Sequence, residues 1–278
     1  MKKRLANAIL LYGCCIILNT VCYAQRWEVP GGTDLSFPRT ILDVKEINLI
    51  RSALQTEEYN TVYKAIFKKV FYTTGEIPTS VQKQGSRLYT VKNDGDDKMD
   101  DPDIIVAPRA SFCKNAAFIY LMYRTANGIG KLSEMHKKVY DELLTQTLYY
   151  LDNIEDDATN GIGDFSATDL HFYRSKEIQM YATAWDLLRG AGLSPNEGPQ
   201  GESAEKKAIR KQMKEARDEM VEWIDNVDFY ANSPGSSLDR NNNKTLLTAA
   251  ALGTAAIVFD DYHQSREWIG HALWSIHN

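Results

Sequence analysis

Apolar residues recur at spacings of three and four along most of the chain, which is the period of an α-helix with one buried face. The pattern predicts helices within residues 43–70, 110–127, 133–152, 172–188, 202–225, 246–259 and 266–277. Stretches rich in Gly, Pro and Asn separate these segments and mark their ends. Outside residues 86–92 no convincing strand pattern appears. The pattern therefore predicts an all-α fold of antiparallel helical hairpins joined by long loops.

The number and length of these segments narrow the architecture. About eight helices of roughly 15 to 24 residues exceed the ordinary mean length. Such helices fit a ring of helical hairpins, an α/α toroid, better than a four-helix bundle. We expect the ring to occupy residues 43–278.

One predicted helix, residues 246–259, is apolar almost all the way round and therefore belongs inside the protein. A polar cluster directly precedes it: Arg240-Asn241-Asn242-Asn243-Lys244-Thr245. Free amide groups and the helix dipole favour an anion at such a helix start. We interpret the cluster as a site for a carboxylate-bearing ligand. Simple capping of the helix by Asn243 is the alternative, and the two roles can coexist.

Two other expected helix starts carry similar chemistry. His171 and Tyr173 lie at a predicted loop-to-helix junction, where His171 could stabilise a carboxylate or take a proton and Tyr173 could protonate a leaving oxygen. Arg109 opens another predicted helix and could bind a sulfate or carboxylate. The plainer interpretation is that Tyr173 packs, His171 caps a helix and Arg109 is a surface arginine.

The first 24 residues combine a basic start, a short apolar run and a small residue before Gln25, which is typical of a bacterial secretory signal peptide. The apolar run is short for a membrane span, so we expect no span in the mature protein. A lipid anchor at Cys22 is the alternative. We expect an exported protein, periplasmic or secreted, with an irregular leader over residues 25–42. Cleavage leaves Cys113 alone, which we expect to be a small buried hydrophobe.

Charge and composition exclude some partners. The net charge is −5 and no basic run follows the signal peptide, which argues against nucleic acid but not against an acidic substrate. The Asp-rich residues 89–103 lack the ligand spacing of a calcium loop. The histidines of the last helix lack a metal-ligand pattern. We therefore expect neither a metal nor a cofactor, and the oligomeric state stays open.

Three stretches resemble the α/α-toroid polysaccharide lyases, especially the heparinase II/III-like and the alginate- or glucuronan-lyase families. They are Phe37-Pro38-Arg39-Thr40-Ile41-Leu42, Tyr181-Ala182-Thr183-Ala184-Trp185-Asp186-Leu187-Leu188, and the Asn-rich cluster with Ala250-Ala251-Leu252-Gly253-Thr254-Ala255-Ala256 after it. The resemblance covers most of residues 37–260. It implies an exported lyase that cleaves a uronic-acid polymer by β-elimination.

The resemblance also implies roles for single residues. The family motif usually reads Asn-Asn-His-Lys, and Asn243 stands here in place of the His. Asn242 carries over as a residue that binds and neutralises the uronate carboxylate, and Asn243 could bind similarly without acid–base chemistry. The family's catalytic Tyr usually follows at a greater distance than this chain reaches at Asn278. We therefore expect an incomplete barrel, and inactivity of the fragment by itself stays an alternative.

In such a reaction the C5 proton leaves and the O4 bond breaks, so donors must stabilise a dianion-like intermediate. Asn242 and Arg240 suit that role, Asn241 and Asn243 suit binding, and His171 or Tyr173 would transfer the proton. We expect the 240–243 cluster and the 171–173 cluster to converge, because helices of one direction in a ring of hairpins begin at the same end.

Two alternatives to a lyase stay open at this stage. A glycoside hydrolase on the same scaffold would need two facing carboxylates, for which Asp164 and Asp169 are the candidate pair. A toroid that binds glycans without cleaving them would use Tyr and Trp as stacking platforms. We interpret a third acid, Asp186, as a polar residue in helix packing.

Overall fold

The computed structural model describes residues 37–42, 46–75, 77–84, 108–124, 134–154, 167–196, 198, 200–232 and 243–277. Within these ranges, only the backbone is described for residues 167–174, 226–232, 243–245, 275 and 277. The chain divides into two units, Met1–Ser36 and Phe37–Asn278, and all described residues belong to the second. The predicted signal peptide and most of the predicted leader lie outside the described residues.

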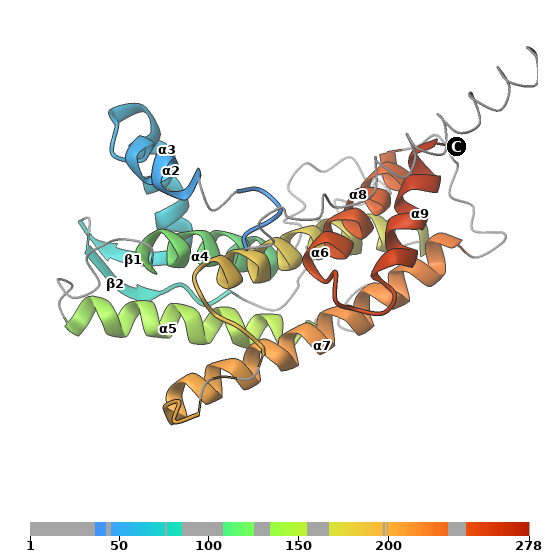
Figure 1. The fold of residues 1–278 in the computed structure, drawn as a ribbon. Coiled ribbons are helices and arrows are strands. Elements are labelled where there is room, and N and C mark those ends of the chain that lie inside the picture. The colour runs from blue at the N-terminus through green and yellow to red at the C-terminus, as the bar shows by residue number, and fades with distance from the viewer. Residues whose placement is uncertain are drawn as a thin grey trace, which may run out of the picture. The chain divides into compact units, whose positions relative to one another are not determined.

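The described residues are mainly helical, as the sequence pattern predicts (Figure 1). In chain order the elements are α2 Glu46–Ala53, α3 Glu57–Val70, β1 Phe71–Thr74, β2 Ile77–Val81, α4 Pro108–Arg124, α5 Glu134–Leu151, α6 Ala167–Gly190, α7 Ala204–Asn232, α8 Asn243–Val258 and α9 Ser265–His277.

A small antiparallel hairpin, β1 and β2, follows α3 and is missing from the sequence prediction. Phe71 opposes Val81 in this hairpin, and both are buried, while Gly75 takes a positive φ of 69° in the turn. The strands are four and five residues long, too short for alternation to stand out beside the longer helical pattern. The predicted strand at 86–92 lies outside the described residues.

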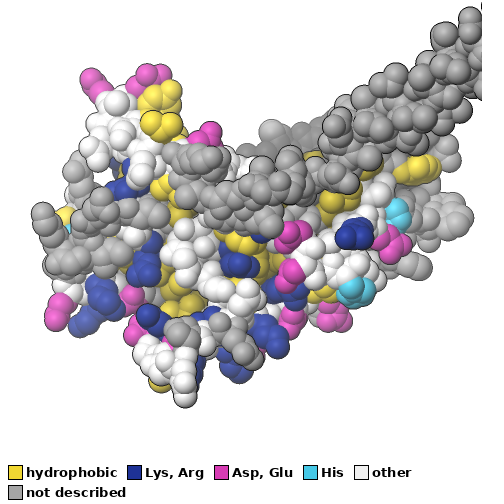
Figure 2. Space-filling model, in the orientation of Figure 1, with side chains coloured by type: hydrophobic (Ala, Val, Ile, Leu, Met, Phe, Trp, Pro, Cys, Tyr) yellow, Lys and Arg dark blue, Asp and Glu magenta, His cyan; other side chains and the backbone are white. Residues whose placement is uncertain are grey.

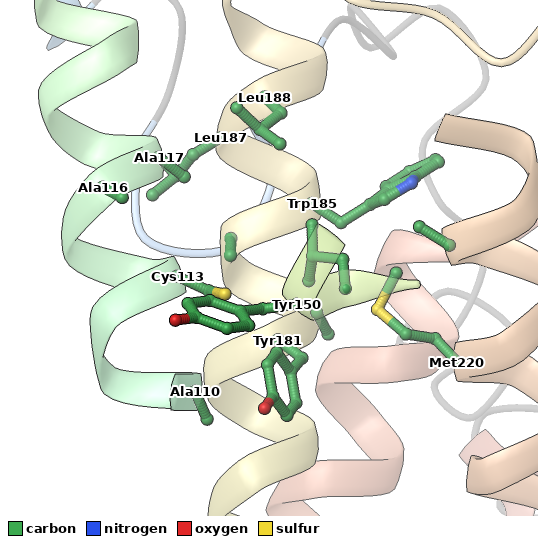
Figure 3. Close-up of a cluster of buried hydrophobic side chains, with 14 of the residues drawn as sticks. Ala110, Cys113, Ala116, Ala117, Tyr150, Tyr181, Trp185, Leu187, Leu188 and Met220 are labelled. Atoms are coloured by element: carbon green, nitrogen blue, oxygen red, sulfur yellow. The ribbon is translucent and has the colours of Figure 1, made fainter. Parts of the chain in front are cut away.

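Helices α4, α6 and α8 lie side by side and run in the same direction. On α6 and α8, the Ser175 and Thr248 hydroxyls are 3.0 Å apart, and the rings of Trp185 and Phe259 are 5.1 Å apart near the other end. Figure 3 shows Ala110 to Ala117 of α4 beside Tyr181 to Leu188 of α6, with residue numbers rising in the same direction. These three parallel helices form one layer of the fold.

Helices α5, α7 and α9 each run back along that layer. Phe112 of α4 contacts Tyr150 of α5 near one end, and Tyr123 stacks on Tyr140 near the other. The indole nitrogen of Trp185 donates to the Met213 carbonyl of α7 at 3.3 Å. A final pair, α8 and α9, forms a hairpin through the turn at 259–264. The six helices are thus three successive antiparallel hairpins.

Small residues line the contacts within the layer of α4, α6 and α8, which we call the inner layer. In α8, Ala249, Ala251, Ala255 and Ala256 are buried, which confirms that this helix belongs largely inside. Small side chains at a contact allow two helix axes to approach closely. Cys113 of α4 is also fully buried, as predicted, and its thiol points to the Thr147 carbonyl of α5. The close packing of these helices fixes how their starts are placed.

Residues 37–42, which we call the strap, cross the end of α6 far from its start. Both carboxylate oxygens of Asp186 accept the Arg39 amide at 2.9 Å, and Oδ2 also accepts the Thr40 amide at 2.9 Å and its hydroxyl at 2.7 Å. The Phe37 ring lies between two guanidinium groups, those of Arg39 and Arg189, each 4.0 Å from the ring centre. Asp186 is therefore the anchor of the strap, which corrects its interpretation as a helix-packing residue.

Candidate functional site

The candidate site is the end of the inner layer at which α6 and α8 begin. Because these two helices are parallel neighbours, their first residues, Ala167 and Asn243, lie at the same end, whereas α4, whose Ala110 lies beside Tyr181 in Figure 3, begins about 12 residues, roughly 18 Å, further along α6. Ser175 is the ninth residue of α6 and its partner Thr248 is the sixth of α8, so α6 begins about one turn further out. The positive ends of two helix dipoles, those of α6 and α8, therefore point to one rim, which favours an anionic ligand there.

Two residues of the sequence hypothesis, His171 and Tyr173, lie on α6 at this end. The sequence places them at a loop-to-helix junction with the helix starting at 172, but α6 begins at Ala167. Both are therefore within the first two turns of the helix. Residues 167–171 contain no Gly or Pro that would mark the end of the preceding loop. Their polar Thr and Asp look like loop residues, so the sequence prediction placed the start of the helix too late.

This helical setting separates the two positions around the axis of α6. Positions two apart lie roughly 160° from each other around a helix. The position of His171 precedes Ser175 by one turn and so belongs to the stripe that meets α8. The position of Tyr173 precedes Glu177 by one turn and belongs to a different stripe. One ligand atom is therefore not reached equally from both positions.

Arg109 is the second residue of α4 and half-buried, so the prediction that it opens a helix is confirmed. Its guanidinium carbon lies 4.9 Å from the centre of the Tyr150 ring, a distance suited to a cation–π contact. The Tyr150 hydroxyl donates to the Gln84 carbonyl at 3.0 Å and accepts from the Gln84 amide at 2.9 Å. Tyr150 is thus fixed by hydrogen bonds, and it holds Arg109 at the start of α4, away from the rim at which α6 and α8 begin.

Burial raises the pKa of the Cys113 thiol, one turn further along α4, well above its ordinary value, and the nearby charge of Arg109 opposes this shift. The thiol therefore stays protonated at neutral pH. Since the thiolate is the reactive form, Cys113 is a structural residue and not a nucleophile.

A buried polar layer lies directly behind the starts of α6 and α8. Ser175, Glu177 and Thr248 are at most 4% exposed, and the Gln179 amide donates to the Leu247 carbonyl at 3.3 Å. Buried polar groups of this kind fix the register of two helices, because a slip would leave them without hydrogen bonds. Sequence reasoning missed this layer, although Ser175, Lys176 and Glu177 interrupt the apolar pattern of α6.

The structure describes only part of the remaining predicted site. Arg240, Asn241 and Asn242 lie outside the described residues, as does Asp164 of the hydrolase pair. The backbone of Asn243 begins α8. The convergence of Asn242 with His171 is therefore still a prediction.

Two features that would narrow the function, a metal-ligand cluster and a membrane-spanning helix, do not occur in the described residues. No group of three or more His, Cys, Asp and Glu side chains in these residues is placed to hold a metal ion. None of the helices described is both long and apolar enough to cross a membrane. Comparisons of the chain with protein-family models, with curated proteins and with solved structures found no match.

Proposed function

We propose that this protein is an exported polysaccharide lyase that cleaves a uronic-acid polymer by β-elimination. The observation that carries the proposal is the shared end at which α6 and α8 begin. The stretch around His171, with proton-transfer chemistry, lies at that end, and the Asn-rich cluster, with anion-binding chemistry, directly precedes α8 in the sequence. A polymer with a carboxylate on each sugar is the substrate that this chemistry suits best.

We further propose that the three hairpins are an arc of an α/α toroid. A parallel inner layer of α4, α6 and α8, with each helix followed by an antiparallel partner, is the arrangement expected of successive hairpins in such a ring. The inner helices of a ring begin on one rim, so that rim would hold the substrate.

The roles follow from the chemistry of each side chain. Asn242 and Arg240 would neutralise the uronate carboxylate and so make the C5 proton easier to remove. Asn241, Asn243 and Arg109 would bind neighbouring sugars. Of the two candidates for proton transfer, we favour His171, because its position lies on the stripe of α6 that meets α8. Tyr173 would then contact the leaving side of the substrate.

The test is the ultraviolet absorbance of the unsaturated sugar that β-elimination creates, measured for the full-length protein with alginate, glucuronan and glycosaminoglycans. The His171→Ala variant should lose at least about a hundredfold in turnover, as expected for removal of a general acid–base group. His263→Ala is the matched control, since His263 is exposed in the turn between α8 and α9. Absence of new absorbance on every uronate polymer would refute the proposal, and saturated reducing ends would indicate a hydrolase.

A further inference from the structure

Helix α7 carries a basic face over its first half. Lys206, Lys207, Arg210, Lys211, Lys214 and Arg217 follow one another at helical spacing on one side of the helix. Between residues 218 and 225 the helix holds four acids and no Lys or Arg. Figure 2 shows Lys and Arg side chains gathered around the region where α7 begins. The charges of α7 are thus separated along its length.

This distribution of charged residues does not stabilise helix α7. Lys206 and Lys207 lie in the first turn, where the helix dipole prefers acidic side chains. Like charges also face each other at spacings of three and four, which destabilises a helix. A face that costs helix stability suggests that its cations serve another purpose.

Internal ion pairs neutralise only part of this face. Arg210 pairs with Glu202, Lys211 with Glu215 at 3.0 Å, and Arg217 with Asp261 at 3.1 Å. Lys206, Lys207 and Lys214 are exposed, and no carboxylate of the described residues lies within ion-pair distance of them. These three lysines can therefore meet an external anion without breaking a described ion pair.

The surroundings of the face indicate the kind of anion. No large hydrophobic side chain is exposed on α7 between residues 204 and 225, so insertion into a membrane is not favoured. The same stretch exposes no aromatic ring on which nucleic acid bases could stack. A row of lysines without apolar anchors suits a hydrophilic polymer with repeated negative charges.

We propose that the basic face of α7 binds the backbone of an acidic polysaccharide at a second surface, distant from the candidate site. Because α7 runs antiparallel to α6, its first turns lie roughly 30–40 Å from the level of His171. Only a long polymer would span that distance, and it would gain affinity from the second contact. The choice of an acidic polysaccharide rests on the proposed function, whereas the binding of a polyanion does not.

The test compares two triple variants of the full chain, each with the same change of net charge. Lys206→Glu, Lys207→Glu and Lys214→Glu remove the basic face, and Lys68→Glu, Lys69→Glu and Lys83→Glu alter exposed lysines elsewhere. Dissociation constants are measured for long alginate at about 0.05 M and about 0.3 M salt. We expect at least about tenfold weaker binding at low salt for the α7 variant and less than about twofold for the control. The thermal midpoint of the α7 variant should not fall, because two of the three substitutions place Glu in the first turn of the helix, where the dipole favours acids, and the third is at an exposed position.

Three results would overturn the inference: equal losses in both variants, unchanged binding in the α7 variant, or equally tight binding of the unaltered protein to DNA or anionic vesicles. Cleavage of short uronate oligomers should be the same in the α7 variant and in the unaltered chain. If the unaltered chain cleaves nothing, the proposed function fails while the comparison of dissociation constants still decides whether this face binds a polyanion.

Discussion

Replacing Asp186 with Ala should detach the strap from α6, and the expected cost follows from the hydrogen bonds that the carboxylate makes. This fully buried group accepts two backbone amides and one hydroxyl at 2.7–2.9 Å. Each hydrogen bond to a charged group is worth about 1.5–3 kcal/mol net. Burial, however, raises the pKa of Asp186 in spite of these bonds, so desolvation of the carboxylate offsets part of the gain.

We therefore expect Asp186→Ala to lower the free energy of unfolding by about 3 kcal/mol, which is a fall of roughly 6–12 °C in Tm. Urea unfolding followed by circular dichroism measures the change. Asp141→Ala is the matched control, because its ion pair with Lys137 is exposed and is worth at most about 1 kcal/mol.

A companion variant tests whether the destabilisation comes from the strap. Thr40→Val removes the hydroxyl donor alone and should cost about 1 kcal/mol. In the double variant the destabilisation should be smaller than the sum of the two single effects, since both substitutions remove the same hydrogen bond. If Asp186→Ala costs no more than Asp141→Ala, or if the two single effects add fully, the carboxylate does not hold the strap.

Further predictions concern the same region and the core. Gly190→Ala should lower the free energy of unfolding by about 1–3 kcal/mol, because the new Cβ would lie 2.5 Å from Pro38 Cδ. Gly253→Ala should be neutral or stabilising, because its Cβ would meet nothing closer than 3.9 Å. Equal changes in Tm for the two variants would contradict this prediction. The raised pKa of Asp186 means that its folded form holds a proton more tightly than its unfolded form. Its contribution to stability should therefore fall as pH rises from about 4 through the raised pKa. The difference in free energy of unfolding between the unaltered protein and Asp186→Asn, taken at several pH values, measures this contribution. A contribution that rises over this pH range would contradict the raised pKa. Cys113 should react with a thiol reagent only after unfolding, and rapid labelling of the native protein would contradict its burial.

Much of the helical framework can be predicted from the sequence, because each long helix carries its own periodic pattern. The α8 helix is the clearest case, since its nearly continuous run of apolar and small residues predicts a helix that is largely buried. The hairpin β1–β2 escaped prediction because its strands are shorter than the window over which alternation is reliable. The start of α6 escaped because polar residues in its first turns look like a loop.

Interactions between distant parts of the chain are less predictable. The role of Asp186 depends on Arg39 and Thr40, which lie 147 and 146 positions away. Nothing in the local pattern around Asp186 distinguishes an anchor from a packing residue. The same holds for the candidate site: the sequence supplies the side chains, but only the parallel directions and the contact of α6 and α8 indicate that their starts lie at one end.

The strap has a consequence for the order in which the protein is completed. Arg39 donates to the Ile257 carbonyl 218 positions later and pairs with Asp260 at 2.9 Å. During synthesis the segment that emerges early must wait until the turn between α8 and α9 has been made. The hairpins can form one after another, but the strap docks only once the last of them begins to close. Docking of the strap therefore occurs only after α8 has formed and its C-terminal end has reached its final position.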